Sequence, residues 1–339
     1  MDIKQAIQTA VDGNNLTQDQ MTDVMNTILS GEATPAQIGG FLVALRIKGE
    51  TIDEITAAAQ VMRALATPVT PKSDDLVDIV GTGGDGLKTF NISTASAIVA
   101  AAAGAHVAKH GNRAASSQSG SADLLELAGI KLDMNPAQVA QCIDQLGVGF
   151  MFAPAHHSAM KYAIGPRKEM AVRTIFNVLG PLTNPAGTKR NYIGVYDKSL
   201  VEPIAHVLMK LGNKHALVVH GLDGLDEISI EQPTMAAELK DDKVVTYEIR
   251  PEDYGIERQA LSSIVVQDSA QSLAMIKSVF SGELGPACDA IALNAGAGIY
   301  VAGIANSLAA GVELAAKTIA SGAAMNKLDD YVAFSRNLN

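Results

Sequence analysis

The stretch from Asp78 to Ser121 begins DIVGTGGDGLKTFNIST and ends KHGNRAASSQSGS, and it decides the fold predicted for the chain. A short β-rich run at 76–80 precedes the glycines, and a helix is predicted after them from 93 to about 103. Residues 105–109 form the next predicted strand. Strands that alternate with helices in this way indicate an α/β fold with a mostly parallel central sheet flanked by helices.

The loops after these two strands have the composition of a polyphosphate site. No Asp or Glu occurs between Gly86 and Ala122, whereas Lys88, Lys109 and Arg113 fall inside that window and the whole chain has a formal charge of −10. Glycine N–H groups can approach phosphates closely, and Lys and Arg balance their charge. Ligands of such sheets bind beyond the carboxyl ends of the strands, where both loops lie. A plain glycine-rich turn is the alternative.

Two familiar phosphate motifs almost fit this stretch, and neither is accepted. Gly81, Gly83 and Gly86 satisfy G-x-G-x-x-G, but a dinucleotide site needs an acidic residue about 20 positions further on, where this chain offers Lys109. The GLKT at 86–89 resembles the end of a P-loop, but its spacing from Gly81 is one residue off. The residues therefore favour a sugar-phosphate or pyrophosphate site.

The sequence before this stretch predicts helices only. Three capping-box patterns lie within residues 1–66, and the two prolines of TPVTP at 67–71 form a stiff, extended link. We therefore expect a small N-terminal all-helical domain at 1–66, which helices from about 160–190 could join. A hinge linker at 67–71 would connect it to a large α/β domain at 72–339.

The β/α alternation continues through the rest of the chain. Helices are expected at 121–127, from 136, at 167–178, 269–282, 285–302 and 306–321, with a last one ending near 334. Further strands are expected at 148–152, 191–196, 216–220, 227–230 and 244–249.

Composition narrows the class of protein. With 339 residues, 47% hydrophobic and 18% charged, the chain can build two domains with ample cores. Only 4% aromatic residues, no Trp and a negative net charge argue against a nucleic-acid partner. The N-terminus carries acids and no apolar run reaches the roughly 18 residues of a membrane span, so neither a signal peptide nor a membrane segment is expected. Cys142 and Cys288 are interpreted as buried free thiols, and a soluble cytoplasmic protein follows.

Five motifs together resemble the anthranilate phosphoribosyltransferase family, over essentially the whole chain. In order they are GTGGD at 81–85, NIST at 91–94, KHGNR at 109–113 with the serine run to 121, RTIFN at 173–177 with LGPLTNP at 179–185, and LDE at 225–227. The chain differs from the family pattern at 157–160, where it has HSAM and the family usually has HPAM. Because proline makes a backbone rigid, that loop is expected to be less stiff here.

The resemblance implies a fold, a reaction and a set of partners. It implies a small helical domain hinged to a large α/β domain, as in some nucleoside phosphorylases, and a homodimer formed through the small domain. The reaction would move phosphoribose from phosphoribosyl pyrophosphate to the amino group of anthranilate with Mg²⁺ as cofactor, the second step of tryptophan biosynthesis from chorismate. Neither nucleic acid nor a membrane is an expected partner.

The resemblance also assigns site residues. No side chain is assigned as a general base, because an aromatic amine is already a neutral nucleophile at pH 7. Asp85 beside phosphates is expected to face a cation or ribose hydroxyls, and Lys88 is a secondary phosphate candidate. The anthranilate contacts are Gly81, Asn112, His157 and Arg167, and the metal ligands are Ser93, Asp226 and Glu227. The phosphoribosyl pyrophosphate contacts are Gly81, Gly83, Gly84, Asp85, Thr89, Asn91, Ile92, Ser93, Thr94, Lys109, His110, Gly111, Asn112, Arg113, Ala114, Ala115, Ser116, Ser117 and Ser121.

Two other functions stay open at this point. A nucleoside phosphorylase of the same fold would use inorganic phosphate and would not need Arg167 for a carboxylate. A catalytically silent homologue that binds nucleic acid would show salt-sensitive affinity for DNA. The negative charge, the few aromatic residues and the Asp226–Glu227 pair argue against the second.

Overall fold

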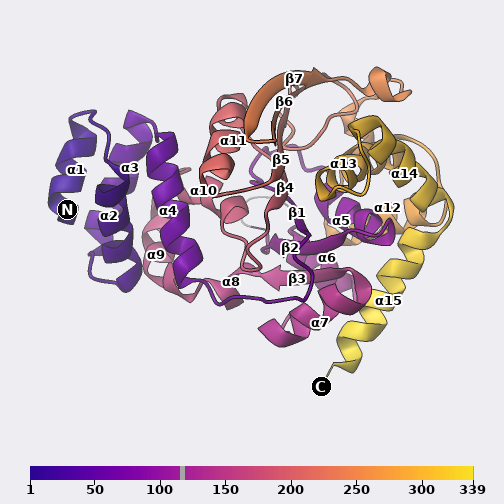
Figure 1. The fold of residues 1–339 in the computed structure, drawn as a ribbon, viewed down its shortest axis with the longest axis horizontal. Coiled ribbons are helices and arrows are strands. Elements are labelled where there is room, and N and C mark those ends of the chain that lie inside the picture. Colours follow the sequence, from indigo (N-terminus) through magenta and orange to yellow (C-terminus); the bar gives the residue numbers. More distant parts are fainter. Residues whose placement is uncertain (115–118, 339) are drawn as a thin grey trace.

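A seven-stranded sheet lies at the centre of the larger body in the computed structural model, which describes residues 1–114 and 119–338. Its strand order is β3-β2-β1-β4-β5-β6-β7, with β1 to β5 parallel and β6 and β7 antiparallel (Figure 1). The predicted mostly parallel α/β fold is confirmed. The strands are β1 (Leu76–Gly81), β2 (His106–Gly111), β3 (Val148–Phe152), β4 (Arg190–Gly194), β5 (His215–Gly221), β6 (Thr234–Lys240) and β7 (Lys243–Ile249).

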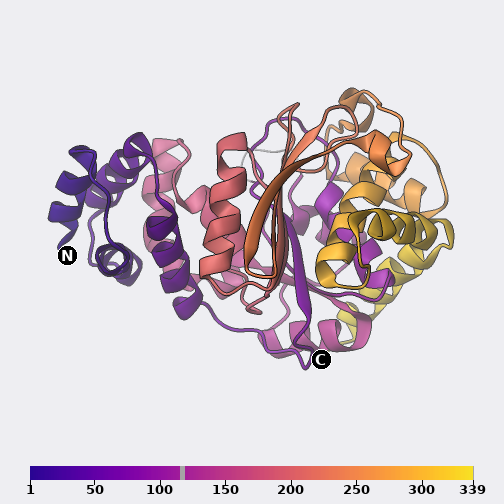
Figure 2. The same ribbon diagram turned by 45° about the horizontal axis from the view of Figure 1, so that its top comes forward.

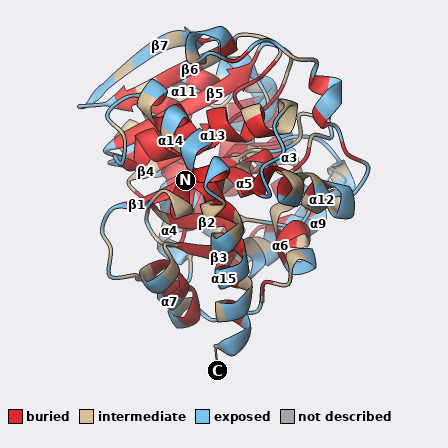
Figure 3. Ribbon diagram, turned by 90° about the vertical axis from the view of Figure 1, so that its right-hand side faces the viewer, coloured by how far each residue is buried: buried red, intermediate tan, exposed pale blue. Residues whose placement is uncertain are grey.

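Two apolar layers cover the sheet, because neighbouring side chains along each strand point to opposite faces. Ile79 packs toward α5 and α13, whereas Val80 joins the cluster with α11 on the other face. Figure 3 shows most of β5, β6 and α13 buried between these layers. The helices of the large body are α5 (Ile92–Ala102), α6 (Ser121–Ala128), α7 (Pro136–Leu146), α8 (Ala153–His156), α10 (Phe176–Leu179), α11 (Val201–Lys210), α12 (Ser269–Phe280), α13 (Pro286–Ala302), α14 (Leu308–Ala320) and α15 (Ala323–Asn337).

A separate group of helices forms one end of the molecule, opposite α12 to α15 (Figure 2). The capping boxes predicted at Thr17, Thr34 and Thr51 are all formed, and each satisfies otherwise unpaired N–H groups at a helix start. Tyr162 of α9 lies against Gly31, and α9 packs on α2 and α3. The group consists of α1 (Ile3–Val11), α2 (Gln18–Ser30), α3 (Pro35–Lys48), α4 (Ile52–Leu65) and α9 (Lys161–Met170).

Thr67 and Val69 anchor the segment at 67–71 to the large body. The Thr67 N–H donates to the His156 carbonyl over 2.9 Å, and the Val69 N–H donates to the Pro185 carbonyl over 3.1 Å. The Val69 side chain is buried in the apolar cluster that includes α5 and α13.

None of the helices in the described part of the chain is long and apolar enough to cross a bilayer.

Three predictions of secondary structure were wrong. Residues 227–230 form a loop, because side-chain groups of other elements take the backbone hydrogen bonds of Ile228. The strand β6 was missed, since its MAAEL sequence has little β preference and pairing with β5 and β7 decides its conformation. The helix predicted at 167–178 is broken, because Ala171 adopts a left-handed φ of 52° after α9.

Candidate active site

The site lies at the carboxyl ends of β1 and β4, where the strand order reverses. The chain leaves β1 to form β2 and β3 on one side and returns to β4 on the other side. Loops that leave this point in opposite directions open a crevice, which is where α/β sheets bind their ligands. The predicted loops after β1 and β2 both begin at this edge.

The glycine loop after β1 takes a shape that other residues would strain to adopt. Gly83, Gly84 and Gly86 have φ of 64°, 82° and 78°. The Gly83 N–H donates to Oδ2 of Asp226 over 2.7 Å, which ties the loop to the segment after β5. At the far end of the loop, the Phe90 N–H donates to the Ile264 carbonyl, just before α5 begins at Ile92.

Asp226 and Glu227 lie directly over the switch point. A Cβ atom at Gly81 would lie 2.5 Å from Oδ2 of Asp226, and one at Gly194 would overlap the Asp226 carbonyl oxygen. Both carboxylates are buried, and burial raises the pKa of Asp226 to about 7, with a further contribution from the nearby Asp85 carboxylate. Burial and the neighbouring Asp226 raise the pKa of Glu227 well above its ordinary value.

This donor set fits a divalent cation. Close, buried carboxylates repel one another, and a bound cation relieves that repulsion. Among the described residues, no group of three or more His, Cys, Asp or Glu side chains could hold a metal by itself. Mg²⁺ commonly takes one or two protein carboxylates and completes its shell with other oxygen ligands, substrate phosphates and water, so Asp226 and Glu227 fit as the carboxylate ligands.

Lys109 brings a buried cation beneath the same point. Its Nζ donates to the Ile79 carbonyl over 2.6 Å and to Oγ of Ser93 over 3.3 Å. Burial lowers the pKa of Lys109, and the carboxylates of Asp78 and Glu227 oppose that shift. The ammonium group is therefore next to the predicted metal ligand Ser93 and within the field of Glu227.

The structure corrects the prediction made for the surroundings of Arg113. Its position in an acid-free window predicted a cation without a nearby carboxylate, but Asp123 and Glu126 follow just beyond that window and both bind its guanidinium. Lys109 likewise lies near carboxylates, those of Asp78 and Glu227. The charges of neighbouring residues in the sequence therefore did not predict which charged groups lie close together in the structure.

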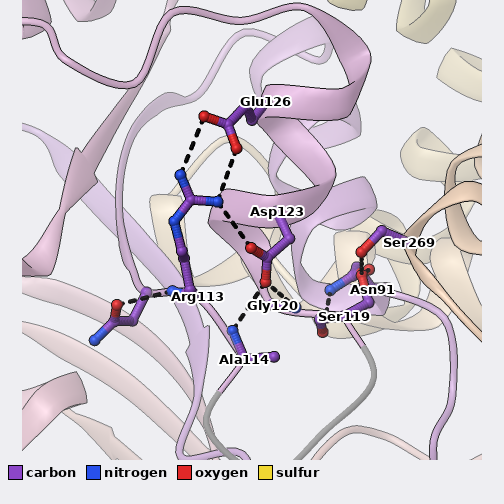
Figure 4. A network of polar contacts seen from close by, with 9 residues as sticks. Asn91, Arg113, Ala114, Ser119, Gly120, Asp123, Glu126 and Ser269 are labelled. Atoms are coloured by element: carbon purple, nitrogen blue, oxygen red, sulfur yellow. Dashed lines mark hydrogen bonds and ion pairs between the residues drawn. The ribbon is translucent and has the colours of Figure 1, made fainter.

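Asn91 also has partners of its own. Its Oδ1 accepts hydrogen bonds from the hydroxyls of Ser119 and Ser272, each over 2.7 Å, and its Nδ2 donates to the Ser119 carbonyl. Asn91 therefore joins the start of α5 to the β2–α6 connection, as Figure 4 shows, and through Ser272 also to α12.

The remaining predicted residues are spread around this edge. Thr89 bridges to Val265, Ile92 and Thr94 are buried in α5, and Gly111 ends β2. Asn112 is exposed, and Ser121 begins α6. Lys88 is exposed in the left-handed region, with φ of 57°. Ala115, Ser116 and Ser117 lie outside the described residues.

Two buried histidines and one arginine complete the predicted site residues. The rings of His110 and His157 lie 5.1 Å apart, and both Nε2 atoms are buried without a hydrogen-bond partner among the described residues. The Arg167 guanidinium lies 5.3 Å from the Phe176 ring centroid and forms no ion pair within the described part of the chain. Burial lowers the pKa of Arg167. A half-buried cation without a carboxylate partner can accept an anionic ligand.

These histidines predict a pH dependence of stability. Burial lowers the pKa of His110 to about 3 and of His157 to about 4, with mutual repulsion adding to the shift of His110. Between about pH 4 and 6.5 the unfolded chain binds protons there that the folded chain does not. Stability is therefore lost as the pH falls through that window, by up to about 1.4 kcal/mol per pH unit for one histidine.

Urea unfolding at several pH values between 4.5 and 7.5 measures this slope. The His157→Gln variant should flatten it by about one proton, since one titrating group is gone. His206→Gln, on the partly exposed side of α11, is the control for losing an imidazole elsewhere. Equal slopes in wild type and His157→Gln would contradict the prediction.

Several positioning residues were missed by the sequence interpretation. Asn294 of α13 accepts from the Ile228 N–H over 2.8 Å and donates to the Ile228 carbonyl over 3.0 Å, which fixes the residue after Glu227. Tyr192 places its hydroxyl 3.4 Å from Oε2 of Glu227. Arg173 donates to the Gly84 carbonyl. Arg173 lies in the RTIFN motif, but nothing local marks Asn294, which lies within the helix predicted at 285–302.

The fold and the site together define a glycosyl transferase built from two parts. Residues 4–66 match the helical bundle domain of the glycosyl transferase family, and residues 73–325 match its a/b domain. The anthranilate phosphoribosyltransferase of Thioalkalivibrio sulfidiphilus is 59% identical over 335 residues, which cover 99% of each chain. The chain belongs to the anthranilate phosphoribosyltransferase family.

Solved structures agree with this assignment. The crystal structure of anthranilate phosphoribosyltransferase from Thermus thermophilus matches with a TM-score of 0.93 at 44% identity, covering 98% of this chain and 99% of that one. The Saccharomyces cerevisiae enzyme, in complex with PRPP and Mg, matches with a TM-score of 0.90 at 27% identity, covering 99% and 98%.

Proposed function

We propose that this chain transfers the 5-phosphoribosyl group of phosphoribosyl pyrophosphate to the amino group of anthranilate, giving N-(5-phosphoribosyl)anthranilate and pyrophosphate. The observation that carries the proposal is the convergence of the glycine loop, Lys109 and the Asp226–Glu227 pair at the switch point of the sheet. Full-length identity of 59% to an anthranilate phosphoribosyltransferase supports this choice among glycosyl transferases.

The chemistry requires an environment for a leaving pyrophosphate. Breaking the C1–O bond of the phosphorylated ribose develops positive charge on the sugar and negative charge on the leaving group. Lys109 supplies a preorganised cation, and the glycine loop, whose Gly83 N–H already donates to Asp226, brings further backbone N–H groups to the same edge. Mg²⁺ held by Asp226 and Glu227, with Ser93 as a further ligand, would neutralise phosphate charge when bound.

The acceptor requires a cation for its carboxylate and no strong base. Arg167 has no carboxylate partner in the described chain, and its guanidinium can form a two-point contact with a carboxylate. His110 and His157 stay neutral above about pH 5, because burial lowers the pKa of both rings. The buried Nε2 of His157, which has no hydrogen-bond partner among the described residues, supports its predicted place beside the acceptor with Asn112 and Gly81.

Arg167 gives a direct test of acceptor identity. One charge-assisted hydrogen bond contributes about 1.5–3 kcal/mol, so Arg167→Ala should raise the KM for anthranilate about 10- to 100-fold and change the KM for phosphoribosyl pyrophosphate much less. Arg167→Lys should recover part of the loss, since Lys lacks the planar fork. Lys168→Ala, exposed on the same helix, is the matched control. A loss confined to phosphoribosyl pyrophosphate would place Arg167 at the phosphates instead.

Two assays test the proposed reaction. Consumption of anthranilate fluorescence should require both phosphoribosyl pyrophosphate and Mg²⁺. Phosphorolysis of thymidine or uridine with inorganic phosphate should not occur. Nucleoside phosphorolysis without anthranilate consumption would overturn the proposal in favour of the phosphorylase alternative.

We also infer a domain division, an assembly and a location. Residues 1–66 with α9 act as the small domain, 67–71 as the hinge and the rest of 72–339 as the large domain, supported by the packing of α9 on α2 and α3. A homodimer through the small domain is supported by exposed Val11 and Ile47, 64% and 82% exposed on the adjacent helices α1 and α3. Sedimentation velocity tests the dimer.

The buried free thiols of Cys142 and Cys288 support a cytoplasmic location.

A further inference from the structure

The carboxylate of Asp123, in the first turn of α6, receives three N–H donors from the connection that follows β2 (Figure 4). Its Oδ1 accepts from Nη1 of Arg113 over 2.9 Å. Its Oδ2 accepts from the backbone N–H of Ala114 over 2.9 Å and from that of Gly120 over 3.1 Å. A single side chain therefore holds the backbone at both ends of the β2–α6 connection.

The two flanks of this connection lie directly against each other. The Ala122 N–H donates to the Asn112 carbonyl over 3.2 Å. A Cβ atom at Gly120 would lie 2.5 Å from the carbonyl carbon of Arg113 and would overlap the Ala114 nitrogen. Only glycine fits at position 120, and it allows the two flanks to approach closely. This close approach lets the carboxylate of Asp123 reach both N–H groups at once.

Arg113 is part of this structure through its side chain. Its Nη1 and Nη2 donate to the two oxygens of Glu126 over 2.7 and 3.1 Å, in addition to the bond with Asp123. The guanidinium also lies over the Phe152 ring, 5.7 Å from its centroid. To contact a phosphate, Arg113 would have to break its hydrogen bonds with two carboxylates. Its contacts are therefore those of a residue that supports the loop.

We propose that Asp123 is a positioning residue for the phosphoribosyl pyrophosphate site, with Arg113 and Glu126 as its support. This inference rests on the proposed function, because the flanks that Asp123 holds carry the predicted contacts Asn112, Ala114 and Ser121. Asp123 acts through these backbone groups and does not touch substrate. The role requires a carboxylate, since both of its oxygens accept from N–H groups and an amide would turn a donor toward one of them.

The Asp123→Asn variant tests the proposal. The KM for phosphoribosyl pyrophosphate should rise about 10- to 100-fold, which corresponds to the loss of one charge-assisted hydrogen bond. The KM for anthranilate should change less than about threefold. Glu126→Gln, in the support of Asp123 on the same helix, weakens only an exposed ion pair, so it should raise this KM for phosphoribosyl pyrophosphate less than about fivefold. A wild-type KM for phosphoribosyl pyrophosphate in Asp123→Asn would overturn the inference.

Arg113→Gln separates support from direct phosphate contact. If Arg113 acts through Asp123, this variant costs less than Asp123→Asn and leaves the salt dependence of phosphoribosyl pyrophosphate binding unchanged. A larger loss than in Asp123→Asn, with a weaker salt dependence, would place Arg113 on a phosphate and overturn its assigned role.

Two measurements do not depend on turnover. Calorimetric titration with phosphoribosyl pyrophosphate and Mg²⁺ reports binding alone, and hydrogen exchange reports the Ala114 and Gly120 amides, which should exchange faster in Asp123→Asn. If wild type binds this ligand but does not consume anthranilate, the proposed function fails while these data still decide the role of Asp123. Should Asp123→Asn fail to fold, Asp123→Glu keeps the charge with a displaced acceptor, and the same separation of KM values is expected.

Discussion

Replacing Gly194 with alanine is expected to remove about 99% of the transferase activity while the fold is retained. A Cβ atom at this position would overlap the carbonyl oxygen of Asp226, so the segment that carries Asp226 and Glu227 must move off the sheet edge. Because the clash is with backbone and not with the end of a flexible side chain, its stability cost is at or above the upper end of the about 1–3 kcal/mol typical of overpacking, still below the about 5–15 kcal/mol stability of a typical protein. A displacement of about 1 Å in a catalytic constellation can cost about 100-fold in rate.

The measurement is kcat at saturating substrates together with the thermal unfolding midpoint. Gly40→Ala is the matched control: Gly40 lies within α3, and the nearest side-chain atom to an added Cβ is 4.0 Å away. Alanine also favours the helix there, so neither activity nor stability should fall. If Gly194→Ala retains more than half of the wild-type kcat, the segment over the switch point does not need the position seen here.

The double variant Asp226→Asn, Glu227→Gln is expected to lose at least about 100-fold in activity at low Mg²⁺ and to bind the ion weakly in calorimetry. The two proposed carboxylate ligands are lost, and neutral amides cannot hold Mg²⁺ against water. The fold should not weaken, because the repulsion between two buried carboxylates is removed and the amide oxygen introduced at position 226 can still accept from the Gly83 N–H.

A second adjacent acidic pair provides the control for this experiment. Asp241 and Asp242 are exposed in the turn between β6 and β7 with φ of 50° and 57°, a conformation that asparagine adopts well. The Asp241→Asn, Asp242→Asn variant should keep wild-type activity and Mg²⁺ dependence. An unchanged Mg²⁺ dependence in the Asp226, Glu227 double variant would show that the ion binds elsewhere.

The sequence by itself determined the elements whose signals are local. The capping boxes at Thr17, Thr34 and Thr51 predicted helices that the structure contains, because a cap and its partner lie three residues apart. Alternation of strands and helices predicted the parallel sheet, since parallel neighbours need a crossover. The loops after β1 and β2 lie at the expected edge for the same reason.

Only the tertiary structure decided which groups meet at that edge. Arg113 lies in an acid-free window yet binds Asp123 and Glu126, because electrostatic forces act through space and α6 turns these carboxylates back onto the loop. The bonds of Asn294 to Ile228 prevented the strand predicted at 227–230. Gly194 has no motif of its own, and its importance arises because a segment 32 residues away crosses above it, at a distance that no local pattern encodes.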